Sequence, residues 1–244
     1  MEGYEPSTYG ERWAGIYDDV WQEALDPGPA VRVLRHLAGG GRALELAIGT
    51  GRVALPLAAD GIEVHGIDVS EGMVERLRRK PGGDAIPVKM GDFADVDVDG
   101  EYSLIYVVFN TFFALTTQED QVRCFKNVAS HLAPGGMFVI EAFVPDLLRF
   151  DRNQRVQTNS VGLEEVSIET ARHDPMEQQI SSQHLVVKEG NVEMYPVFIR
   201  YAFPAELDLM GQIAGLDLKA RYADWDKTPF TAASTSHISV YEKA

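Results

Sequence analysis

ALELAIGTGR, residues 43–52, is the segment of the sequence that most clearly indicates the fold. Its first half is an apolar, strand-like run with one carboxylate, Glu45, and its second half is a turn that contains Gly49 and Gly51. Glycine lets a backbone come close to a ligand, and the helix-like segment that follows would begin with free N–H groups. This order of strand, glycine turn and helix predicts a ligand site at the turn.

Asp68 ends the next strand-like run, residues 62–67. A carboxylate at the end of the second strand is placed to accept hydrogen bonds from both hydroxyls of a ribose. Together with the glycine turn, Asp68 predicts a site for a nucleoside-containing cofactor. Which cofactor binds there is left open at this point.

The composition favours one α/β domain with a modest elaboration, because 244 residues with 45% hydrophobic content can build a sizeable core. A formal charge of −15 argues against nucleic acid or an anionic membrane surface as the main partner. The single cysteine, Cys124, excludes an intrachain disulfide and fits packing in a reducing cytosol. No basic-then-apolar leader and no run of about 18 apolar residues occurs. We therefore expect a soluble, cytoplasmic protein.

Strand and helix patterns alternate as far as Phe143. Continuously apolar runs such as SLIYVVF, residues 103–109, are typical of parallel strands that are covered on both faces. The alternation predicts a doubly wound α/β sheet. We expect strands at 42–47, 62–67, 86–90, 103–109 and 136–143, and helices at 52–60, 70–80 and 118–132.

The pattern changes after Phe143, where strand-like segments follow one another with no helix between them. This predicts an antiparallel meander with strands at 164–171, 177–188 and 191–203. Pro196 in its third strand suggests an edge position. A helix at 204–213 and strands at 216–225 and 235–243 are expected to follow.

We expect a single domain, residues 1–244, built in four parts. An aromatic N-terminal part, 1–25, carries Tyr9, Trp13, Tyr17 and Trp21 on one or two short helices. The other three are a cofactor-binding core (28–143), the meander over the substrate pocket (160–203), and a C-terminal helix and hairpin (204–244).

GTGRVA, residues 49–54, also matches the G-x-G-x-x-A pattern of dinucleotide-binding folds. An NAD(P)-dependent oxidoreductase is therefore a genuine alternative, although the sequence lacks a convincing Tyr-x-x-x-Lys pair for hydride transfer. Other features point elsewhere. Glu45 lies inside the first strand, Ser70 after Asp68 can cap the next helix, and Met73 can lie on an adenine face. Gly91-Asp92-Phe93 follows the third strand, where a carboxylate can accept a hydrogen bond from an exocyclic amine.

This set resembles the class I S-adenosylmethionine-dependent methyltransferases over about residues 28–143 and 200–243. The resemblance implies a seven-stranded, mostly parallel sheet with a reversed last strand, and S-adenosyl-L-methionine as the cofactor. Residues 45–51 would form the glycine loop and residues 107–113 the stretch that faces the sulfonium. The cofactor-binding residues that it implies are Tyr17, Glu45, Ala47, Gly49, Gly51, Arg52, Asp68, Val69, Met73, Gly91, Asp92, Phe93, Phe109 and Asn110.

The opening YGERWAGIYD, residues 9–18, resembles the N-terminal lid of small-molecule members of this family. Tyr9, Trp13 and Tyr17 can close over the sulfonium through cation–π contacts. The alternative is that these aromatics simply pack an N-terminal helix onto the sheet. We predict Tyr17 as a cofactor and catalytic residue, and Tyr9 and Trp13 as substrate contacts.

Three residues further along the chain complete the candidate site. His184 is an isolated polar group on an apolar face of the meander, which makes it a catalytic candidate, with a purely structural histidine as the alternative. Glu141, at the end of the fifth strand, lies at the edge of the sheet where ligands bind. Phe113 and Glu141 are predicted substrate contacts.

Phe109-Asn110-Thr111-Phe112 stands where base- and glutamine-methylating members of the family carry an Asn-Pro-Pro-Tyr type motif, and no metal-ligand cluster is evident. With the acidic charge, this favours a small-molecule acceptor, at nitrogen or oxygen, and no nucleic-acid or membrane partner. The lid and meander resemble those of sugar N-methyltransferases and related natural-product tailoring enzymes. A non-catalytic cofactor-binding module stays open, and exposed meander edges can pair in a homodimer.

Overall fold

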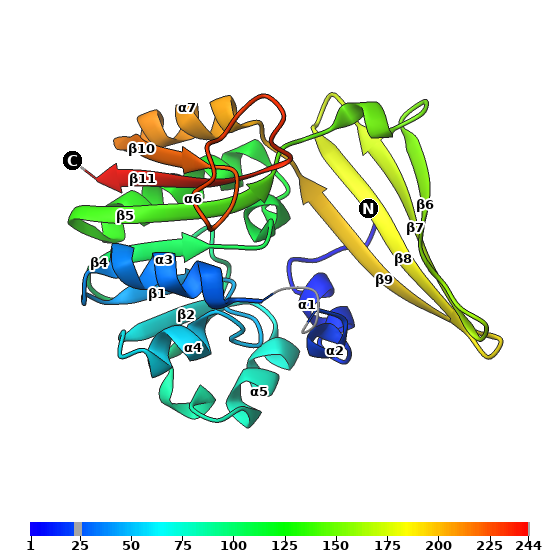
Figure 1. Cartoon of the computed structure of the whole chain (residues 1–244), viewed down its shortest axis with the longest axis horizontal. Coiled ribbons are helices and arrows are strands. Elements are labelled where there is room, and N and C mark those ends of the chain that lie inside the picture. Colours follow the sequence, from blue (N-terminus) through cyan, green and yellow to red (C-terminus); the bar gives the residue numbers. More distant parts are fainter. Residues whose placement is uncertain (22–25, 244) are drawn as a thin grey trace.

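Figure 1 shows a computed structural model of the chain, which describes residues 1–21 and 26–243. A large sheet with its helices forms the body, and a second, four-stranded sheet projects from it. Residues 22–25 of the expected lid and the side chain of Trp21 lie outside the described part.

Seven strands form the large sheet in the order β10-β11-β5-β4-β1-β2-β3. Neighbours from β5 to β3 pair in parallel, whereas β11 runs antiparallel to both β5 and β10. The predicted doubly wound sheet with a reversed last strand is confirmed. Its strands are β1 (Ala43–Leu46), β2 (Val64–Asp68), β3 (Val88–Met90), β4 (Tyr102–Val107), β5 (Leu132–Phe143), β10 (Leu216–Tyr222) and β11 (Ser236–Lys243).

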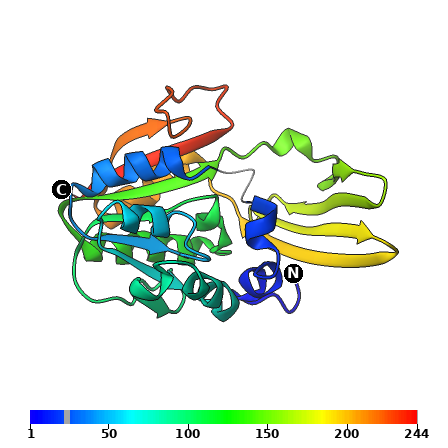
Figure 2. The same ribbon diagram turned by 60° about the horizontal axis from the view of Figure 1, so that its bottom comes forward.

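Helices cover both faces of the large sheet (Figure 2). On one face Leu34 and Leu57 enter the core, and on the other Phe125 and Leu207 do so; all four are fully buried. Burying apolar surface on both faces is what fixes a sheet of continuously apolar strands. The helices are α3 (Gly28–Ala38), α4 (Ala54–Ala59) and α5 (Glu71–Arg79) with α6 (Gln118–His131) and α7 (Pro204–Ala214).

Capping side chains set where two of these helices begin. Ser70 Oγ accepts a hydrogen bond from the Met73 N–H at 3.2 Å, as the sequence predicts, and so starts α5. Thr117 Oγ1 accepts one from the Asp120 N–H at 3.1 Å and starts α6. The start of α5 therefore lies directly after Asp68, at the carboxyl edge of the sheet.

The second sheet is antiparallel throughout, in the order β6-β7-β8-β9. Its strands are β6 (Gln154–Val161), β7 (Glu165–Asp174), β8 (Gln179–Lys188) and β9 (Asn191–Arg200). The predicted meander is confirmed, as is the edge position of Pro196 in β9. Strand β6 is not among the strands predicted from the sequence, because its mostly polar side chains are nearly all exposed and give no alternating pattern.

Arg200 fastens the base of the meander to the body. Its guanidinium is 6% exposed and forms an ion pair with Glu206 of α7 at 2.7 Å. It also donates a hydrogen bond to the Gln121 side chain of α6. A buried, hydrogen-bonded ion pair costs several kcal/mol when one partner is removed. The meander is therefore held in one place relative to the carboxyl edge of the large sheet.

Two short N-terminal helices, α1 (Thr8–Trp13) and α2 (Tyr17–Trp21), lie between the two sheets (Figure 1). Trp13 is 4% exposed and packs with Met73 of α5 and Tyr195 of β9. The helices thereby join α5 to the meander above the edge where β1, β2 and β4 end.

Candidate functional site

The glycine turn after β1 has two glycines with different surroundings. Gly49 and Gly51 have φ angles of +57° and +76°, a region that favours glycine. A Cβ on Gly51 would lie 2.3 Å from Leu77 Cδ1, so Gly51 lets α5 pack closely. A Cβ on Gly49 would meet no atom nearer than the Ala47 carbonyl at 4.0 Å. Gly49 thus presents an open backbone surface on which a ligand can lie.

Asp68 ties this turn to β2. One carboxylate oxygen accepts the Gly49 N–H at 2.7 Å and the other accepts the Ser70 N–H at 2.8 Å. Burial raises the pKa of Asp68, while these backbone hydrogen bonds act in the opposite direction. The Val69 N–H also bonds to this carboxylate, so three backbone donors occupy three of its roughly four acceptor positions. Asp68 can therefore hold the turn and still accept a hydrogen bond from a ribose.

Glu45 lies in β1 with 4% of its surface exposed. Burial raises its pKa to about 8, although the Tyr106 hydroxyl donates to it at 3.0 Å and the charge of Arg52 favours the carboxylate. Arg52 lies 4.2 Å above the ring of Phe109 and interacts with the hydroxyl of Tyr17. The turn therefore carries a buried acid beside a guanidinium, a pair that suits the ammonium and carboxylate of an amino acid.

These groups surround a small cavity of about 30 Å³ at the carboxyl edge of the sheet. Its lining brings together residues that the sequence places far apart, from the N-terminal helices, the glycine turn and the segment after β4. The predicted cofactor residues among them are Tyr17, Glu45, Ala47, Gly49, Arg52 and Phe109.

The segment after β4 has an unusual backbone. Phe109 and Asn110 both adopt positive φ angles, +66° and +64°, which cost energy for residues other than glycine. Asn110 Oδ1 accepts the Phe143 N–H at 2.7 Å. Glu141, predicted to contact substrate, instead accepts the Phe109 N–H at 2.9 Å and the Trp225 Nε1–H at 3.0 Å. The structure thus engages both of its carboxylate oxygens within the protein.

Charged groups that no local sequence pattern predicts anchor the N-terminal helices to the glycine turn and the start of α5. Asp18 accepts hydrogen bonds from the Thr50 hydroxyl at 2.7 Å and from Lys80 Nζ at 2.8 Å. Glu11 accepts from the Ser70 hydroxyl at 2.8 Å and the Gly72 N–H at 3.1 Å. The partners lie 30 or more residues apart in the chain, so no local pattern could reveal them.

An aromatic cluster connects the small cavity to the meander. Tyr9 stacks on Trp13 with 5.6 Å between ring centroids and meets Tyr17 edge-on at 6.5 Å. The ring of Trp13 lies 5.3 Å from His184 and 4.9 Å from Tyr195. These contacts bury Trp13 almost completely, so its ring packs α1 against the meander. The cluster thus runs from Tyr17 at the cavity through Tyr9 and Trp13 to His184 in β8.

The proton affinity of His184 follows from its surroundings. Burial lowers the pKa of its imidazole, and the charge of Glu169, its partner on β7, acts in the opposite direction. Burial therefore favours the neutral form of this imidazole.

Several predicted residues lie outside this constellation. Phe113 is fully buried beside Phe112 and Phe143, so it fills the core and offers a substrate no surface. Phe93 is 8% exposed within the same core, and Met73 packs beneath Trp13. Three further predicted cofactor residues follow β2 and β3. Val69 is exposed, and a Cβ on Gly91 would meet no atom within 4 Å. Asp92 accepts the Ala94 N–H at 2.8 Å.

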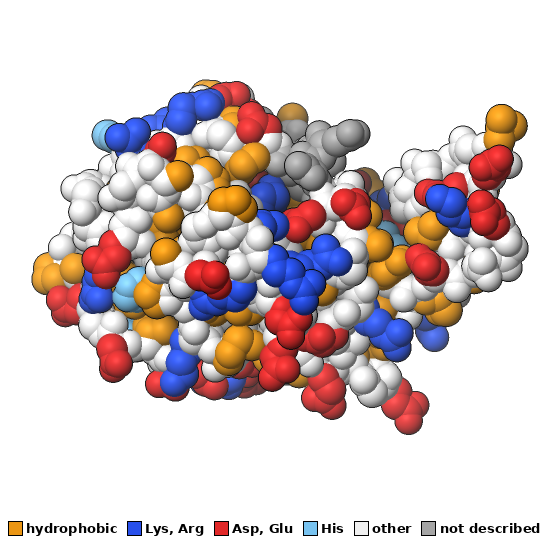
Figure 3. All heavy atoms as spheres, turned by 90° about the horizontal axis from the view of Figure 1, so that it is seen from below, with side chains coloured by type: hydrophobic (Ala, Val, Ile, Leu, Met, Phe, Trp, Pro, Cys, Tyr) orange, Lys and Arg blue, Asp and Glu red, His pale blue; other side chains and the backbone are white. Residues whose placement is uncertain are grey.

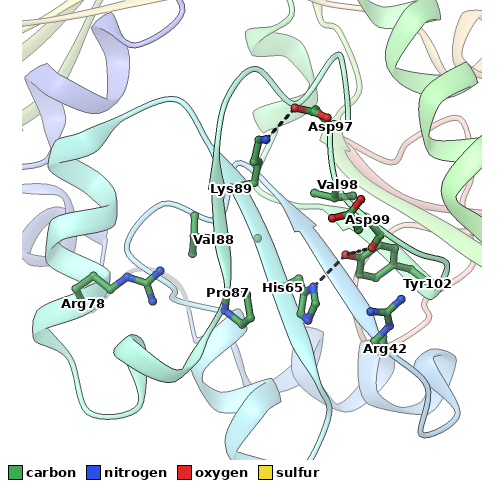
Figure 4. A pocket seen from close by; sticks show the side chains of 11 residues that line it. Arg42, His65, Arg78, Pro87, Val88, Lys89, Asp97, Val98, Asp99 and Tyr102 are labelled. Atoms are coloured by element: carbon green, nitrogen blue, oxygen red, sulfur yellow. Dashed lines mark hydrogen bonds and ion pairs between the residues drawn. The ribbon is translucent and has the colours of Figure 1, made fainter.

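A larger cavity of about 610 Å³ lies elsewhere, beside β2 and β3 (Figure 4). Two pairs of its polar side chains already contact each other: Lys89 pairs with Asp97 at 2.9 Å, and His65 Nδ1 lies 3.0 Å from the Tyr102 hydroxyl. It contains no residue of the predicted site. The small cavity under the N-terminal helices, lined by Glu45 and the glycine turn, is therefore the candidate site.

The surface of the described residues carries charges of both signs. On the face seen in Figure 3, Lys and Arg side chains are interspersed with Asp and Glu and form no broad basic surface. Within residues 1–21 and 26–243, no group of three His, Cys, Asp or Glu side chains could hold a metal ion. No helix among them is long and apolar enough to cross a membrane.

Comparisons with known proteins give the family. A methyltransferase-domain family model matches residues 43–136, from the start of β1 into β5. The cypemycin N-terminal methyltransferase of a Streptomyces species is 30% identical over 243 residues, covering 98% of this chain and 99% of that protein. A dTDP-4-amino-2,3,4,6-tetradeoxy-D-glucose N,N-dimethyltransferase of Saccharopolyspora spinosa is 32% identical over 142 residues, covering 55% of this chain and 56% of that protein.

Among solved structures, the CcbJ methyltransferase from Streptomyces caelestis superposes with a TM-score of 0.91 at 37% identity, covering 99% of this chain and 100% of that one. None of these relatives is an oxidoreductase, so the dinucleotide interpretation of the glycine turn finds no support. Likeness over the full length, in sequence and in structure, shows that this chain belongs to the S-adenosylmethionine-dependent methyltransferases.

Proposed function

We propose that this enzyme methylates a nitrogen atom of a small natural-product intermediate, and that amino sugars are the first acceptor class to test. The names of two relatives support a nitrogen atom as the methyl acceptor, since one methyltransferase is named for the N-terminus of cypemycin and the other for an amino sugar nucleotide. A neutral amine has its lone pair free, whereas a hydroxyl acceptor, the alternative, must also lose its proton.

The observation that carries the proposal is the cavity that joins Tyr17, Glu45, Gly49, Arg52 and Phe109 beneath the N-terminal helices. The open side of Gly49 gives the cofactor a backbone surface on which to lie. The buried acid and the guanidinium give complementary charges for an ammonium and a carboxylate. The charges of these residues complement the amino-acid end of S-adenosyl-L-methionine.

We further propose which residues hold the rest of the cofactor. Asp68 accepts a hydrogen bond from the ribose, and Asp92 accepts one from the adenine amine. Val69, Met73, Gly91 and Phe93 shape the adenine side. When bound, S-adenosyl-L-methionine supplies an activated methyl group on a sulfonium. The chain itself must then orient an acceptor and exclude water, and such positioning can contribute about 7–11 kcal/mol.

The roles proposed for the acceptor side fall on the aromatic cluster. The ring of Tyr17 forms a wall of the cavity, so it can face the reacting centre, and the neutral His184 can take up the proton that a protonated amine must lose. Tyr9, between Trp13 and Tyr17, is the proposed substrate contact. Replacing His184 by Asn should lower kcat most at pH values below the pKa of the free amine, whereas a purely structural histidine would change only the thermal midpoint.

Calorimetric titration with S-adenosylhomocysteine, followed by assays with labelled cofactor, tests the proposal. We expect binding in the micromolar range and methylation within a panel of amino sugars, phenols and carboxylic acids. Absence of binding up to millimolar ligand would contradict the cofactor site. Methylation of phenols or carboxylic acids alone would contradict the nitrogen acceptor.

We propose that the parts named above work as one domain in the cytoplasm, and that two chains pair through β6. Within residues 1–21 and 26–243 no strand pairs with the outer edge of β6, and its Val156 and Val161 are 74% and 76% exposed. An exposed edge with apolar side chains invites pairing with a second copy. Light scattering should give twice the mass of one chain, and Val156→Lys should reduce it to that of one chain. A mass of one chain for the unaltered protein would refute the pairing.

A further inference from the structure

The carboxylate of Glu141 joins three segments at the carboxyl edge of the sheet. It lies near the end of β5, and its Oε2 accepts the Phe109 N–H at 2.9 Å. Its Oε1 accepts the Trp225 Nε1–H at 3.0 Å, and Trp225 belongs to the loop between β10 and β11. Hydrogen bonds to a charged acceptor are the stronger ones. One side chain thus links β5, the segment after β4 and the C-terminal loop.

The backbone that Glu141 holds is one that the chain would not adopt by itself. Phe109 and Asn110 lie in the left-handed region, with φ of +66° and +64°. Such residues persist only when their surroundings fix them, and they gather at functional sites. Two further bonds fix this pair: Asn110 N–H donates to the Glu141 carbonyl at 3.1 Å, and Asn110 Oδ1 accepts the Phe143 N–H at 2.7 Å.

The conformation of Phe109 bears directly on the cofactor cavity. Its ring lies 4.2 Å below the guanidinium of Arg52, and both residues line the cavity with Tyr17 and Glu45. If the Phe109 backbone relaxed to an ordinary negative φ, the ring would move away from the cavity. Arg52 would then lose the cation–π contact with this ring. One of the contacts that place Arg52 therefore depends on bonds made by Glu141, a residue outside the cavity lining.

We propose that Glu141 is a positioning residue for cofactor binding: through the Phe109 backbone it holds the ring that supports Arg52, and Trp225 holds Glu141. This inference rests on the proposed cofactor cavity and assigns Glu141 no contact with substrate. The C-terminal loop thereby acts on the cofactor pocket across the edge of the sheet. Loss of either hydrogen bond is expected to weaken cofactor binding more than it weakens the fold.

The test compares Glu141→Leu, Trp225→Phe and the control Asp226→Asn in the full chain. Asp226 lies in the same loop but is 77% exposed, with only a 3.8 Å ion pair to Arg32. The readouts are the dissociation constant of S-adenosylhomocysteine by calorimetry and the thermal midpoint of the ligand-free protein. We expect the dissociation constant to rise about tenfold or more in Glu141→Leu and about threefold in Trp225→Phe, which loses one bond. Asp226→Asn should match the unaltered protein.

A second variant keeps the proposal testable if Glu141→Leu folds poorly. Phe109→Leu keeps the backbone N–H but removes the ring beneath Arg52, so it should weaken binding by a similar factor. Combined with Trp225→Phe, its effect should be less than the product of the two, because both act through the same ring. If the two effects on the dissociation constant multiplied in the double variant, or if binding were unchanged in all variants, the proposal would be overturned. Failure of the unaltered protein to bind S-adenosylhomocysteine would instead contradict the proposed function.

Discussion

At the scale of single residues, Glu45 is the group whose chemistry the fold changes most clearly in the candidate site. A glutamate is ordinarily ionised at pH 7, but burial raises the pKa of Glu45 to about 8. In the ligand-free protein most molecules therefore carry a protonated Glu45 at neutral pH. A cation that enters the cavity favours the carboxylate, so binding and proton release are linked.

The first prediction follows from this linkage. Binding of S-adenosylhomocysteine at pH 7 should release close to one proton, and affinity should fall as the pH drops below about 8. Calorimetry in buffers of different ionisation enthalpy measures the proton directly. Glu45→Gln should abolish the release. The same release in Glu45→Gln would show that another group supplies the proton.

The sign of the stability effect is also fixed. Because the folded pKa of Glu45 lies above its unfolded value, its stabilising contribution is complete below the unfolded pKa and is lost as the pH rises through about 8. Glu45→Gln should therefore gain stability relative to the unaltered protein between pH 5 and pH 9. Thermal midpoints across that range check the trend, and a constant difference between the two proteins would contradict it.

The two glycines of the turn give the second prediction, with each serving as the control for the other. Gly51→Ala should cost about 2–4 kcal/mol of stability, because the backbone is strained and the new Cβ overlaps Leu77. Gly49→Ala should cost only about 1 kcal/mol but should weaken cofactor binding more, since the Cβ would occupy the open surface. Urea unfolding and calorimetry separate the two effects. Equal effects of both variants on binding would contradict the assignment.

At the scale of elements, the strands and helices of the sheet could be predicted because each carries its own periodicity. The continuously apolar β4 and β5 and the amphipathic α6 all appear within a few residues of their predicted places. Strand β6 could not be predicted, because an exposed edge strand needs no apolar face. The anchoring of α2 was equally invisible, since Asp18, Thr50 and Lys80 are ordinary surface residue types in the sequence.

That anchoring gives the third prediction. Asp18→Ala removes the hydrogen bonds from Thr50 and Lys80 and should release α2 from the glycine turn, at a cost of about 1–3 kcal/mol. The dissociation constant of S-adenosylhomocysteine should rise with it, because Tyr17 of α2 lines the cavity. Asp19→Ala is the matched control, since Asp19 is exposed. Equal binding by the two variants would contradict an anchoring role for Asp18.

The same anchor should depend on pH. Burial alone would raise the pKa of Asp18, but hydrogen bonds from Lys80 and Thr50 outweigh it and hold the pKa below its ordinary value. The stabilising contribution of Asp18 is therefore complete above the unfolded pKa of about 4 and is lost as the pH falls through the folded value. The stability difference between the unaltered protein and Asp18→Ala should shrink towards pH 3.

At the scale of the whole molecule, the chain places a cofactor turn at the edge of one sheet and roofs it with helices and a second sheet. The family can be predicted from residues 43–93, because the motif that contains Glu45, Gly49 and Asp68 is recognisable in the sequence itself. The acceptor side does not follow, because its geometry comes from contacts between α1, β8 and β9 that form only on folding. Glu141 shows the same limit: its place at the sheet edge was predictable, but its partners were not.

The central claim is that the cavity under the N-terminal helices binds the methyl donor through Asp68 and the glycine turn. Calorimetric titration of the full chain with S-adenosylhomocysteine, beside Asp68→Ala, tests it most directly. We expect one ligand per chain in the micromolar range for the unaltered protein and an affinity about tenfold or more lower in Asp68→Ala. Equal affinity of the two proteins, or no heat with either, would contradict it.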